Sequence, residues 1–396
     1  MVWLRQTIAV MLVSLKTIPA RLGSSAVAII GIAGVVVVFV SVLSISAGFQ
    51  NAMGGGVEPP RAIILRAGSD TEMTSGLSGD DARLIKEAPG IRHEGGNPLA
   101  SAELYAIVEI PKKSAPDSGA NVPLRGIEPV AMSVRENFSI IEGRMLQFGT
   151  NEVIVGKAAN SQYVGLNVGE TLVSGQNRWK IVGIFEADGG VAETEVWCDV
   201  HLMQGAYMRV NSFSVMVVRL DSMDSFQPLT ASLTKNPQLN VDVRREHEYY
   251  RSRSEAMTRL INTLGFGIAF LMGIGAVFGA VLTMYTAVAT RTREIATLRA
   301  LGFNTASVLV SVLAESLVLG AIGGIIGATA AYFGFNGYQT STMNFQTFSQ
   351  VAFAFRVTPG LLATGLIYAL AMGLIGGLLP AIRAARLPIS SALREL

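Results

Sequence analysis

The chain has 396 residues, of which 50% are hydrophobic and 15% are charged, whereas average soluble domains carry about 25% charged residues. The formal net charge of +2 and the lack of a basic stripe with interleaved aromatic residues argue against nucleic acid as a partner. Charges are scarce in four segments and ordinary elsewhere, which is typical of membrane spans that alternate with segments in water. These segments are 24–49, 260–289, 304–335 and 357–382.

Residues 1–23 are predicted to form a helix on the membrane surface, with Arg5, Lys16 and Arg21 toward the lipid headgroups. The alternative is a signal peptide with its apolar region at 8–15. No A-x-A-like cleavage site follows closely, and the next apolar run is far too long for a signal peptide. We therefore expect the surface helix to be retained.

The first transmembrane helix is predicted over 24–49, a run without a charged residue. At about 1.5 Å per residue this run reaches about 39 Å, enough to cross a hydrocarbon core of about 30 Å with some tilt. Further transmembrane helices are predicted over 256–289, 304–335 and 358–382, with an outer loop at 336–357. The expected fold class is a membrane α-helical protein with four transmembrane helices. A large α+β extracytoplasmic domain is inserted between the first and the second.

Residues 50–255 are expected to form this domain, because about 200 residues can bury a core of their own. Short helices are predicted over 78–88 and 224–234, and a loop over 119–122. Apolar runs rich in β-branched residues predict strands at 62–66, 103–110, 152–156, 179–187 and 213–220. The stretch 125–200 is expected to form an inserted second lobe.

The charged, helix-compatible stretch 244–259 runs directly into the second span. A continuous helix there would join the domain rigidly to the membrane segment. Cys198 is the only cysteine, which excludes an intrachain disulfide. Cys198 and His201 form a lone C-x-x-H, whereas a zinc site needs about four ligands, so we expect a buried thiol and no metal site.

Short basic segments set the expected orientation. They are Arg5, Lys16 and Arg21 before the first span, Arg291, Arg293 and Arg299 between the second and third, and Arg383, Arg386 and Arg394 after the fourth. With four spans all of these lie on one side, which the positive-inside rule makes cytoplasmic. Five arginines between 244 and 259 oppose this assignment, but long domains are translocated largely regardless of charge. Both termini, including the tail 383–396, are therefore expected in the cytoplasm.

Glycines are dense in the last three spans, which favours close helix packing over a water-filled pore. Glu315 is the only acidic residue expected at membrane depth. It is either part of a transport path or a hydrogen-bonding partner between helices.

The sequence has no catalytic motif. Gly156-Lys157 is followed by Ala158, so it is not a phosphate-binding P-loop, and neither H-E-x-x-H nor G-x-S-x-G occurs. We predict no catalytic, cofactor-binding or metal-binding residue. An energy source must then come from another polypeptide.

The segment 290–303, TRTREIATLRALGF, lies in the short basic loop. On a helix, Ile295, Leu298 and Leu301 fall in one arc together with Glu294, while Arg293 and Arg299 lie outside it. Gly302 is expected to end the helix. The segment is either a docking helix for a soluble partner or a basic turn that only fixes topology.

This segment resembles a motif of a known family. Arg291-x-Arg293-Glu294-Ile295-x-x-Leu298-Arg299-Ala300-Leu301-Gly302 is similar to the R-x-R-E-I-x-x-L-R-A-x-G stretch of the FtsX/MacB/LolC–LolE superfamily of ABC transporter permeases. The C-terminal segment also resembles the ending of that family. It reads Gly377-Leu378-Leu379-Pro380-Ala381-x-x-Ala384-Ala385-Arg386-x-Pro388-x-x-x-Ala392-Leu393-Arg394. Supporting matches are 142–144, 151–156, 165–169 and 182–185.

The resemblance implies a non-catalytic permease subunit in the bacterial inner membrane, with its large domain in the periplasm. It implies a homodimer or heterodimer, two copies of a cytoplasmic ATPase that bind ATP and Mg, and contact with membrane lipids. A periplasmic adaptor or lipoprotein chaperone is a further implied partner. The 290–303 helix would couple the ATPase to the domain by mechanotransmission. The implied ATPase-coupling residues are Arg291, Arg293, Glu294, Ile295, Leu298, Arg299, Leu301 and Gly302.

The chain differs from the best-known MacB arrangement because no nucleotide-binding domain precedes the first span, so we expect a stand-alone permease. The large outer domain favours the MacB/LolC-like branch over FtsX. Expected substrates for export or extraction are drugs, peptides, lipoproteins or lipids. The alternatives are an FtsX-like regulator of a periplasmic enzyme, with nothing transported, and a membrane-anchored structural or sensor module without an ATPase.

Overall fold

The computed structural model describes residues 22–54, 60–135, 138–174, 177–343 and 349–388. Within them the chain divides into two compact units. The helical unit comprises 22–47, 259–338 and 355–388, and the sheet unit comprises 48–258 and 339–354. The surface helix predicted over 1–23 lies almost wholly outside the described residues, as does the tail from 389 onward.

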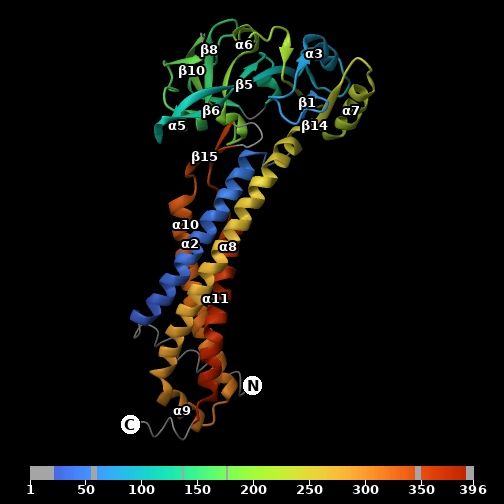
Figure 1. Ribbon diagram of the computed structural model, residues 1–396. Coiled ribbons are helices and arrows are strands. Elements are labelled where there is room, and N and C mark those ends of the chain that lie inside the picture. The colour runs from blue at the N-terminus through green and yellow to red at the C-terminus, as the bar shows by residue number, and fades with distance from the viewer. Residues whose placement is uncertain (1–21, 55–59, 136–137, 175–176, 344–348, 389–396) are drawn as a thin grey trace. The chain divides into compact units, whose positions relative to one another are not determined.

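Four long helices dominate the helical unit (Figure 1). They are α2 (Leu22–Ala52), α8 (Glu246–Ala289), α10 (Thr305–Phe335) and α11 (Pro359–Arg386). In the described part of the chain, these four helices are long and apolar enough to cross a membrane. The helix α8 is a single element of 44 residues, so the charged stretch before the second span is continuous with that span.

Glycines lie where these helices approach closely. A Cβ at Gly327 of α10 would lie 2.6 Å from the carbonyl oxygen of Ala33 in α2. A Cβ at Gly320 would lie 2.9 Å from the carbonyl oxygen of Ala369 in α11. Only glycine allows these separations, so this part of the glycine pattern serves helix packing. In contrast, a Cβ at Gly275 of α8 would meet no described atom within 4 Å.

The described part of the sheet unit contains one mixed sheet of ten strands, in the order β14-β1-β13-β5-β6-β11-β8-β10-β7, with β9 paired to β10 (Figure 1). The strands are β1 (Arg61–Arg66), β5 (Ala100–Lys112), β6 (Ala115–Ile127), β7 (Ser139–Gly143), β8 (Glu152–Gly156), β9 (Thr171–Ser174), β10 (Asn177–Glu186), β11 (Val196–Asp199), β13 (Val215–Arg219) and β14 (Val241–Arg245). The α-helices of this unit are α3 (Gly79–Lys86), α4 (Ala131–Val134), α5 (Lys157–Gln162), α6 (Val200–Ala206) and α7 (Phe226–Lys235).

The long strand β5 joins two halves of this sheet. Its residues 100–103 pair with β13, and its residues 104–112 pair with β6. The second half is therefore built from residues that lie between β5 and β13 in the sequence. The inserted lobe was predicted to start at residue 125. It starts earlier, because its first strand, β6, begins at Ala115.

Three local predictions need correction. Residues 119–122 are not a loop but part of β6, which pairs with β5. The run 213–220 is not one strand, because Ser212–Phe213 pairs with Leu77–Ser78 as β12 and β2 before β13 begins. The outer loop 336–357 contains a hairpin of β15 (Gln339–Met343) and β16 (Gln350–Ala354). This hairpin belongs to the sheet unit, where β16 contacts β6 and the 3-10 turn η2 (Val191–Thr194).

Other predictions agree with the structure. The helix α3 has the predicted acidic first turn and a capping box, in which Ser78 and Asp81 each bond the backbone N–H of the other.

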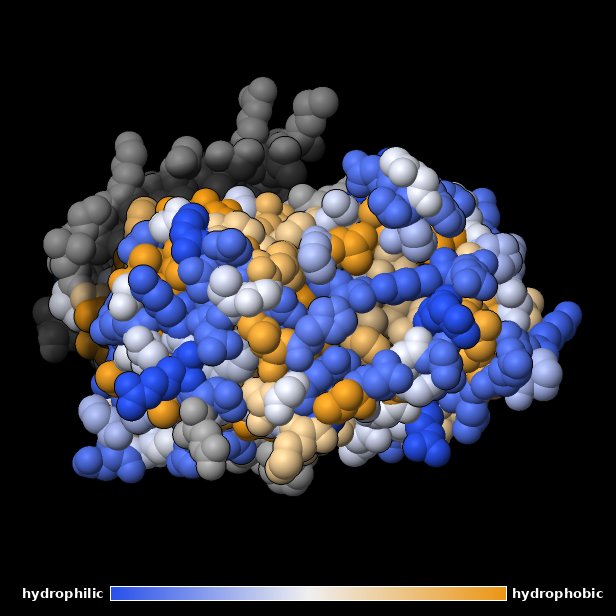
Figure 2. Space-filling model, turned by 90° about the horizontal axis from the view of Figure 1, so that it is seen from above, coloured by the Kyte–Doolittle hydropathy of each residue, from blue (hydrophilic) through white to orange (hydrophobic). Residues whose placement is uncertain are grey.

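The core of the second half includes Phe185, Trp197 and Phe138, with ring centroids 4.4 Å apart for Phe185 and Trp197. Figure 2 shows a face of the sheet unit on which hydrophilic side chains surround scattered apolar ones, as expected for a domain in water.

Candidate coupling site

The basic loop forms a short helix, α9 (Thr292–Ala300), between α8 and α10. It is shorter than the predicted 290–303. At its C-terminal end Gly302 adopts a φ of +92°, a backbone conformation that favours glycine. The N–H of Gly302 donates to the carbonyl of Arg299 at 3.1 Å, and the N–H of Phe303 donates to that of Leu298 at 3.2 Å. These bonds close the helix where the sequence predicted its end.

Arg291 fixes the start of α9. Its side chain is buried, and its Nη1 donates to Oε2 of Glu315 in α10 at 3.3 Å. Its Nε donates to Oε2 of the exposed Glu294 at 3.0 Å. Because an unpaired charge in a buried site is strongly unfavourable, the pairing of Arg291 with Glu315 holds α9 against α10. Glu315 is therefore a partner in a contact between helices, one of the two roles the sequence allowed.

Arg299 fixes the other end of α9. Its guanidinium Nη1 donates to the backbone carbonyl of Leu387, the residue that follows α11. Between the two ends, Ile295 and Ala296 are buried, and Ile295 packs in a cluster with residues of α8, α10 and α11. That cluster includes Met284, Val288, Val308, Val312, Ala381 and Ala384. The helix α9 is thus bound to the three spans that surround it.

The eight residues predicted for ATPase coupling therefore fall into two groups. Arg291 and Ile295 are buried, and Leu298 and Arg299 are half-buried, so the predicted apolar arc does not form one exposed stripe. Arg293, Glu294, Leu301 and Gly302 are exposed, and Leu301 is 72% exposed. The first group positions α9, and the second is available for contact with another protein.

The sheet unit contains a buried charge cluster that no sequence motif predicted. Arg125 of β6 donates two hydrogen bonds to Glu195, both at 2.7 Å. It also donates to Glu72 at 2.6 Å and to Glu103 of β5 at 2.9 Å. Arg135 donates to both oxygens of Glu103, at 2.7 and 2.9 Å. Three carboxylates and two guanidinium groups thus meet where β5 and β6 join the two halves of the sheet.

The first turns of α8 take part in this cluster. The hydroxyl of Tyr250 donates to Oε1 of Glu72 at 3.1 Å, and the N–H of Glu72 donates to the hydroxyl of Tyr249 at 3.2 Å. The guanidinium of Arg253 lies 3.8 Å from the ring centroid of Tyr249, where it brings a third positive charge. The start of α8 is therefore bonded to Glu72, one of the three carboxylates that Arg125 binds.

The pKa shifts in the cluster follow from burial and charge. Burial raises the pKa of Glu103, but the charges of Arg135 and Arg125 and their hydrogen bonds outweigh it and hold that pKa below its ordinary value. Burial and the charge of Glu72 raise the pKa of Tyr250 well above its ordinary value. Tyr250 therefore keeps the proton that its hydrogen bond to Glu72 requires.

The two residues of the C-x-x-H pair differ in exposure. Cys198 is buried, and its Sγ lies 3.7 Å from the carbonyl oxygen of Arg125, whereas His201 is exposed. Among the described residues, no group of three or more potential ligands could hold a metal ion. Burial raises the pKa of the Cys198 thiol, which keeps it protonated and unreactive.

Two family models match the chain along most of its length. The model of the MacB-like periplasmic core domain matches residues 25–236, and that of the FtsX-like permease C-terminal region matches residues 266–389. Together with four apolar helices and a large mixed sheet, they define a membrane protein with a periplasmic domain. The chain belongs to the MacB/FtsX family of ABC transporter permeases.

Curated relatives agree with this assignment. The macrolide export ATP-binding/permease protein MacB of Hyphomonas neptunium is 25% identical over 338 residues, which is 77% of this chain and 51% of that protein. The uncharacterized ABC transporter permease YvrN of Bacillus subtilis is 36% identical over 128 residues, 32% of this chain and 29% of that protein. The chain thus spans about half or less of the length of these relatives. The crystal structure of the periplasmic region of MacB from Actinobacillus actinomycetemcomitans has 11% identity and a TM-score of 0.37, and the match covers 50% of this chain and 94% of that one.

Proposed function

We propose that this chain is the permease subunit of an ABC transporter complex, and that a separate cytoplasmic ATPase drives motion of its periplasmic domain. The observation that carries the proposal is the attachment of α9. This helix is fixed to α10 by Arg291 and Glu315 and bonded by Arg299 to the end of α11, while Arg293, Glu294 and Leu301 remain exposed. A displacement of α9 by a bound ATPase would therefore also displace α10 and α11, because these contacts join the three helices.

The complex proposed here contains two permease copies and two ATPase subunits, which bind the ATP and Mg. The family assignment supports this arrangement. The permease itself contributes no catalytic group, lies in the bacterial inner membrane and has both termini in the cytoplasm. The name of the MacB relatives refers to macrolide export, and we propose export or extraction of a substrate from the periplasmic side as the function of the complex.

Two substitutions in α9 test the coupling role. Glu294→Lys reverses a charge on the exposed side, and Leu301→Asp puts a charge on a large apolar residue that is 72% exposed. Since central contacts in an interface are worth about 1–2 kcal/mol or more, each change is expected to weaken ATPase binding by about tenfold or more. The measurement is the amount of ATPase retained on the tagged full-length permease, together with ATP hydrolysis by the eluted complex.

The matched control is Met208→Asp, which charges an exposed apolar residue of the sheet unit. It is expected to leave ATPase retention unchanged, and the permease alone is expected to hydrolyse no ATP. Retention of the ATPase at the wild-type level by both α9 variants would overturn the coupling assignment.

A further inference from the structure

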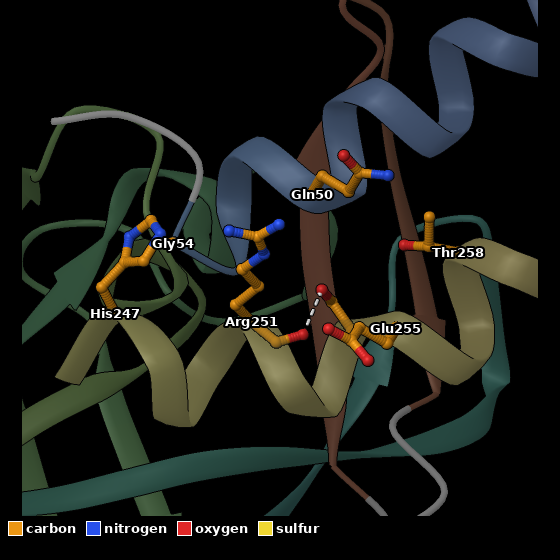
Figure 3. Close-up of a pocket in the computed structure, with 7 residues that line it drawn as sticks. Gln50, Gly54, His247, Arg251, Glu255 and Thr258 are labelled. Carbon is orange, nitrogen blue, oxygen red and sulfur yellow. Dashed lines mark hydrogen bonds between the residues drawn. The ribbon is translucent and has the colours of Figure 1, made fainter. Parts of the chain in front are cut away.

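The sheet unit contains a polar pocket between the end of α2 and the first turns of α8 (Figure 3). Its volume is about 360 Å³, which lies within the usual range for small-ligand sites. It is lined by Gln50, Gly54, His247, Arg251, Ser254, Glu255 and Thr258. None of these residues belongs to α9 or to the Arg125 cluster, so the pocket is separate from both.

Helix geometry explains why these residues meet. The five lining residues from α8 are spaced by four, three, one and three positions, which puts them on one face of the helix. Gly54 has a φ of +107°, and a Cβ there would lie 3.4 Å from the carbonyl oxygen of His247. The positive φ therefore favours glycine in the turn that follows α2 beside His247 of α8.

The pocket lies at the polar end of two apolar helices. Gln50 is in the last turn of α2, and Thr258 comes two residues before Leu260, where the apolar run of α8 begins. Charged residues at such a boundary are at the level of lipid headgroups when the apolar run is in the bilayer. This places the pocket where a headgroup can enter it.

Thr258 supplies an independent sign of a ligand. Thr258 is only 9% exposed, and its Oγ1 has no hydrogen-bond partner among the described residues. Thr283, in the same helix, instead donates to the carbonyl of Gly279 at 2.8 Å. A buried hydroxyl without a partner is unfavourable, and Figure 3 shows Thr258 beside the other lining residues. A ligand in the pocket would satisfy this hydroxyl.

The charges of the lining residues indicate the chemical class of this ligand. Arg251 and Glu255 are both exposed and carry opposite charges, and no bond joins their side chains in Figure 3. A guanidinium is well suited to bind phosphate, and a carboxylate can accept hydrogen bonds from a primary ammonium. A quaternary ammonium prefers a cage of aromatic rings, and no Trp, Tyr or Phe is among the seven lining residues.

We propose that this pocket binds the headgroup of a phospholipid that carries a phosphate and a primary amine, as phosphatidylethanolamine does. The phosphate is bound by Arg251 and the Thr258 hydroxyl, and the ammonium by Glu255. Binding needs neither ATP nor an ATPase, so this inference stands or fails separately from the proposed function.

The test is a titration of the full-length chain, purified and delipidated in detergent, with short-chain phosphatidylethanolamine, phosphatidylcholine and phosphatidylglycerol. Phosphatidylethanolamine is expected to bind about tenfold or more tightly than phosphatidylcholine, because only its amine can donate to Glu255. Arg251→Gln and Thr258→Val are expected to weaken its binding by about fivefold or more. Glu255→Gln is expected to abolish the preference over phosphatidylcholine.

Two further variants serve as controls. Thr258→Ser keeps the hydroxyl and is expected to bind like the wild type. Arg259→Gln removes an exposed positive charge of the same helix that does not line the pocket, and it is expected to change binding little. In lipid-free protein, Thr258→Val is expected to raise the thermal unfolding midpoint, because it removes an unpaired buried hydroxyl.

Three results would overturn the proposal. The first is equal affinity of the wild type for phosphatidylethanolamine and phosphatidylcholine. The second is a loss for Arg259→Gln as large as that for Arg251→Gln, which indicates general attraction to charged lipid surfaces. The third is binding of soluble phosphoethanolamine as tight as that of the lipid, which assigns the pocket to a free solute instead.

Discussion

Arg125 is the residue whose loss should disturb the sheet unit most. Its guanidinium donates to three buried carboxylates, and its side chain is only 2% exposed. Arg125→Met removes the charge but keeps much of the volume, which leaves Glu72 and Glu195 buried without their main partner. Breaking a buried ion pair in this way costs about 3–5 kcal/mol. We expect a clear fall in the thermal unfolding midpoint of the full-length protein, measured in detergent by intrinsic fluorescence.

The control for this substitution is Arg144→Gln. Arg144 pairs with Glu152, but its side chain is 56% exposed, so water can replace the lost partner. The thermal unfolding midpoint of the Arg144→Gln protein is expected to stay close to that of the wild type. If Arg125→Met were as stable as Arg144→Gln, the cluster would not hold the sheet together.

The cluster shows why single residues were the hardest feature to predict. The partners of Arg125 lie 22, 53 and 70 positions away in the sequence, so no local pattern joins them. The available signal was a charge within an apolar strand, as at Arg125 beside Leu124 and at Glu103 beside Leu104. The same limit applies to Ile295, because periodicity places a side chain on a helix face but does not say which face is covered.

At the scale of the elements, the contact of Gly327 with α2 can be tested by adding one methyl group. In Gly327→Ala the new Cβ would lie 2.6 Å from the carbonyl oxygen of Ala33 and 2.8 Å from the Cβ of Val36, so the helices must separate. Overpacking of this kind costs about 1–3 kcal/mol. We expect a lower thermal unfolding midpoint and faster proteolysis of the detergent-solubilised protein.

The matched change is Gly275→Ala in α8, where the new Cβ would meet no described atom within 4 Å. Alanine favours a helix over glycine by about 1 kcal/mol, so this variant is expected to be as stable as the wild type or more stable. Equal destabilisation by both substitutions would contradict a role for Gly327 in close packing.

The long elements were predictable because length and hydropathy are strong signals. The third span was expected over 304–335 and forms Thr305–Phe335, and the continuous helix into the second span was expected from 244 and begins at Glu246. The hairpin of β15 and β16 was missed because its strands are short and lie in a stretch assigned to a loop. Its strand β16 contacts elements far away in the sequence, such as β6 and η2, and such support is not visible from the residues of the hairpin alone.

At the scale of the whole molecule, α8 and α2 are the two described helices that run from one unit into the other, and α8 is the one that leads to α9. Its residues up to Thr258 belong to the sheet unit, and those from Arg259 onward belong to the helical unit. Its start is bonded to Glu72, one of the three carboxylates around Arg125, and its end leads directly to α9. If α8 carries motion from the ATPase to the periplasmic domain, helical continuity at the boundary between the units is required.

Ala256→Pro interrupts α8 at an exposed position close to this boundary. Proline removes one backbone hydrogen bond and clashes with the preceding turn, at a cost of about 3 kcal/mol. The readout is the distance between spin labels on Met208→Cys in the two copies of the proposed dimer, because Met208 is 91% exposed. The buried Cys198 is not expected to react with the label.

With an intact α8, addition of a non-hydrolysable ATP analogue to the complex is expected to shift the distance between the Met208 labels. In Ala256→Pro that shift is expected to disappear, while the ATPase stays bound because α9 is unchanged. Ala256→Ser, which keeps the backbone hydrogen bond, should respond like the wild type. A full shift in the proline variant would mean that motion reaches the periplasmic domain by a route other than α8. Loss of ATPase binding would instead mean that the contact at α9 is disturbed. The two measurements together therefore distinguish a loss of ATPase docking at α9 from a loss of transmission along α8.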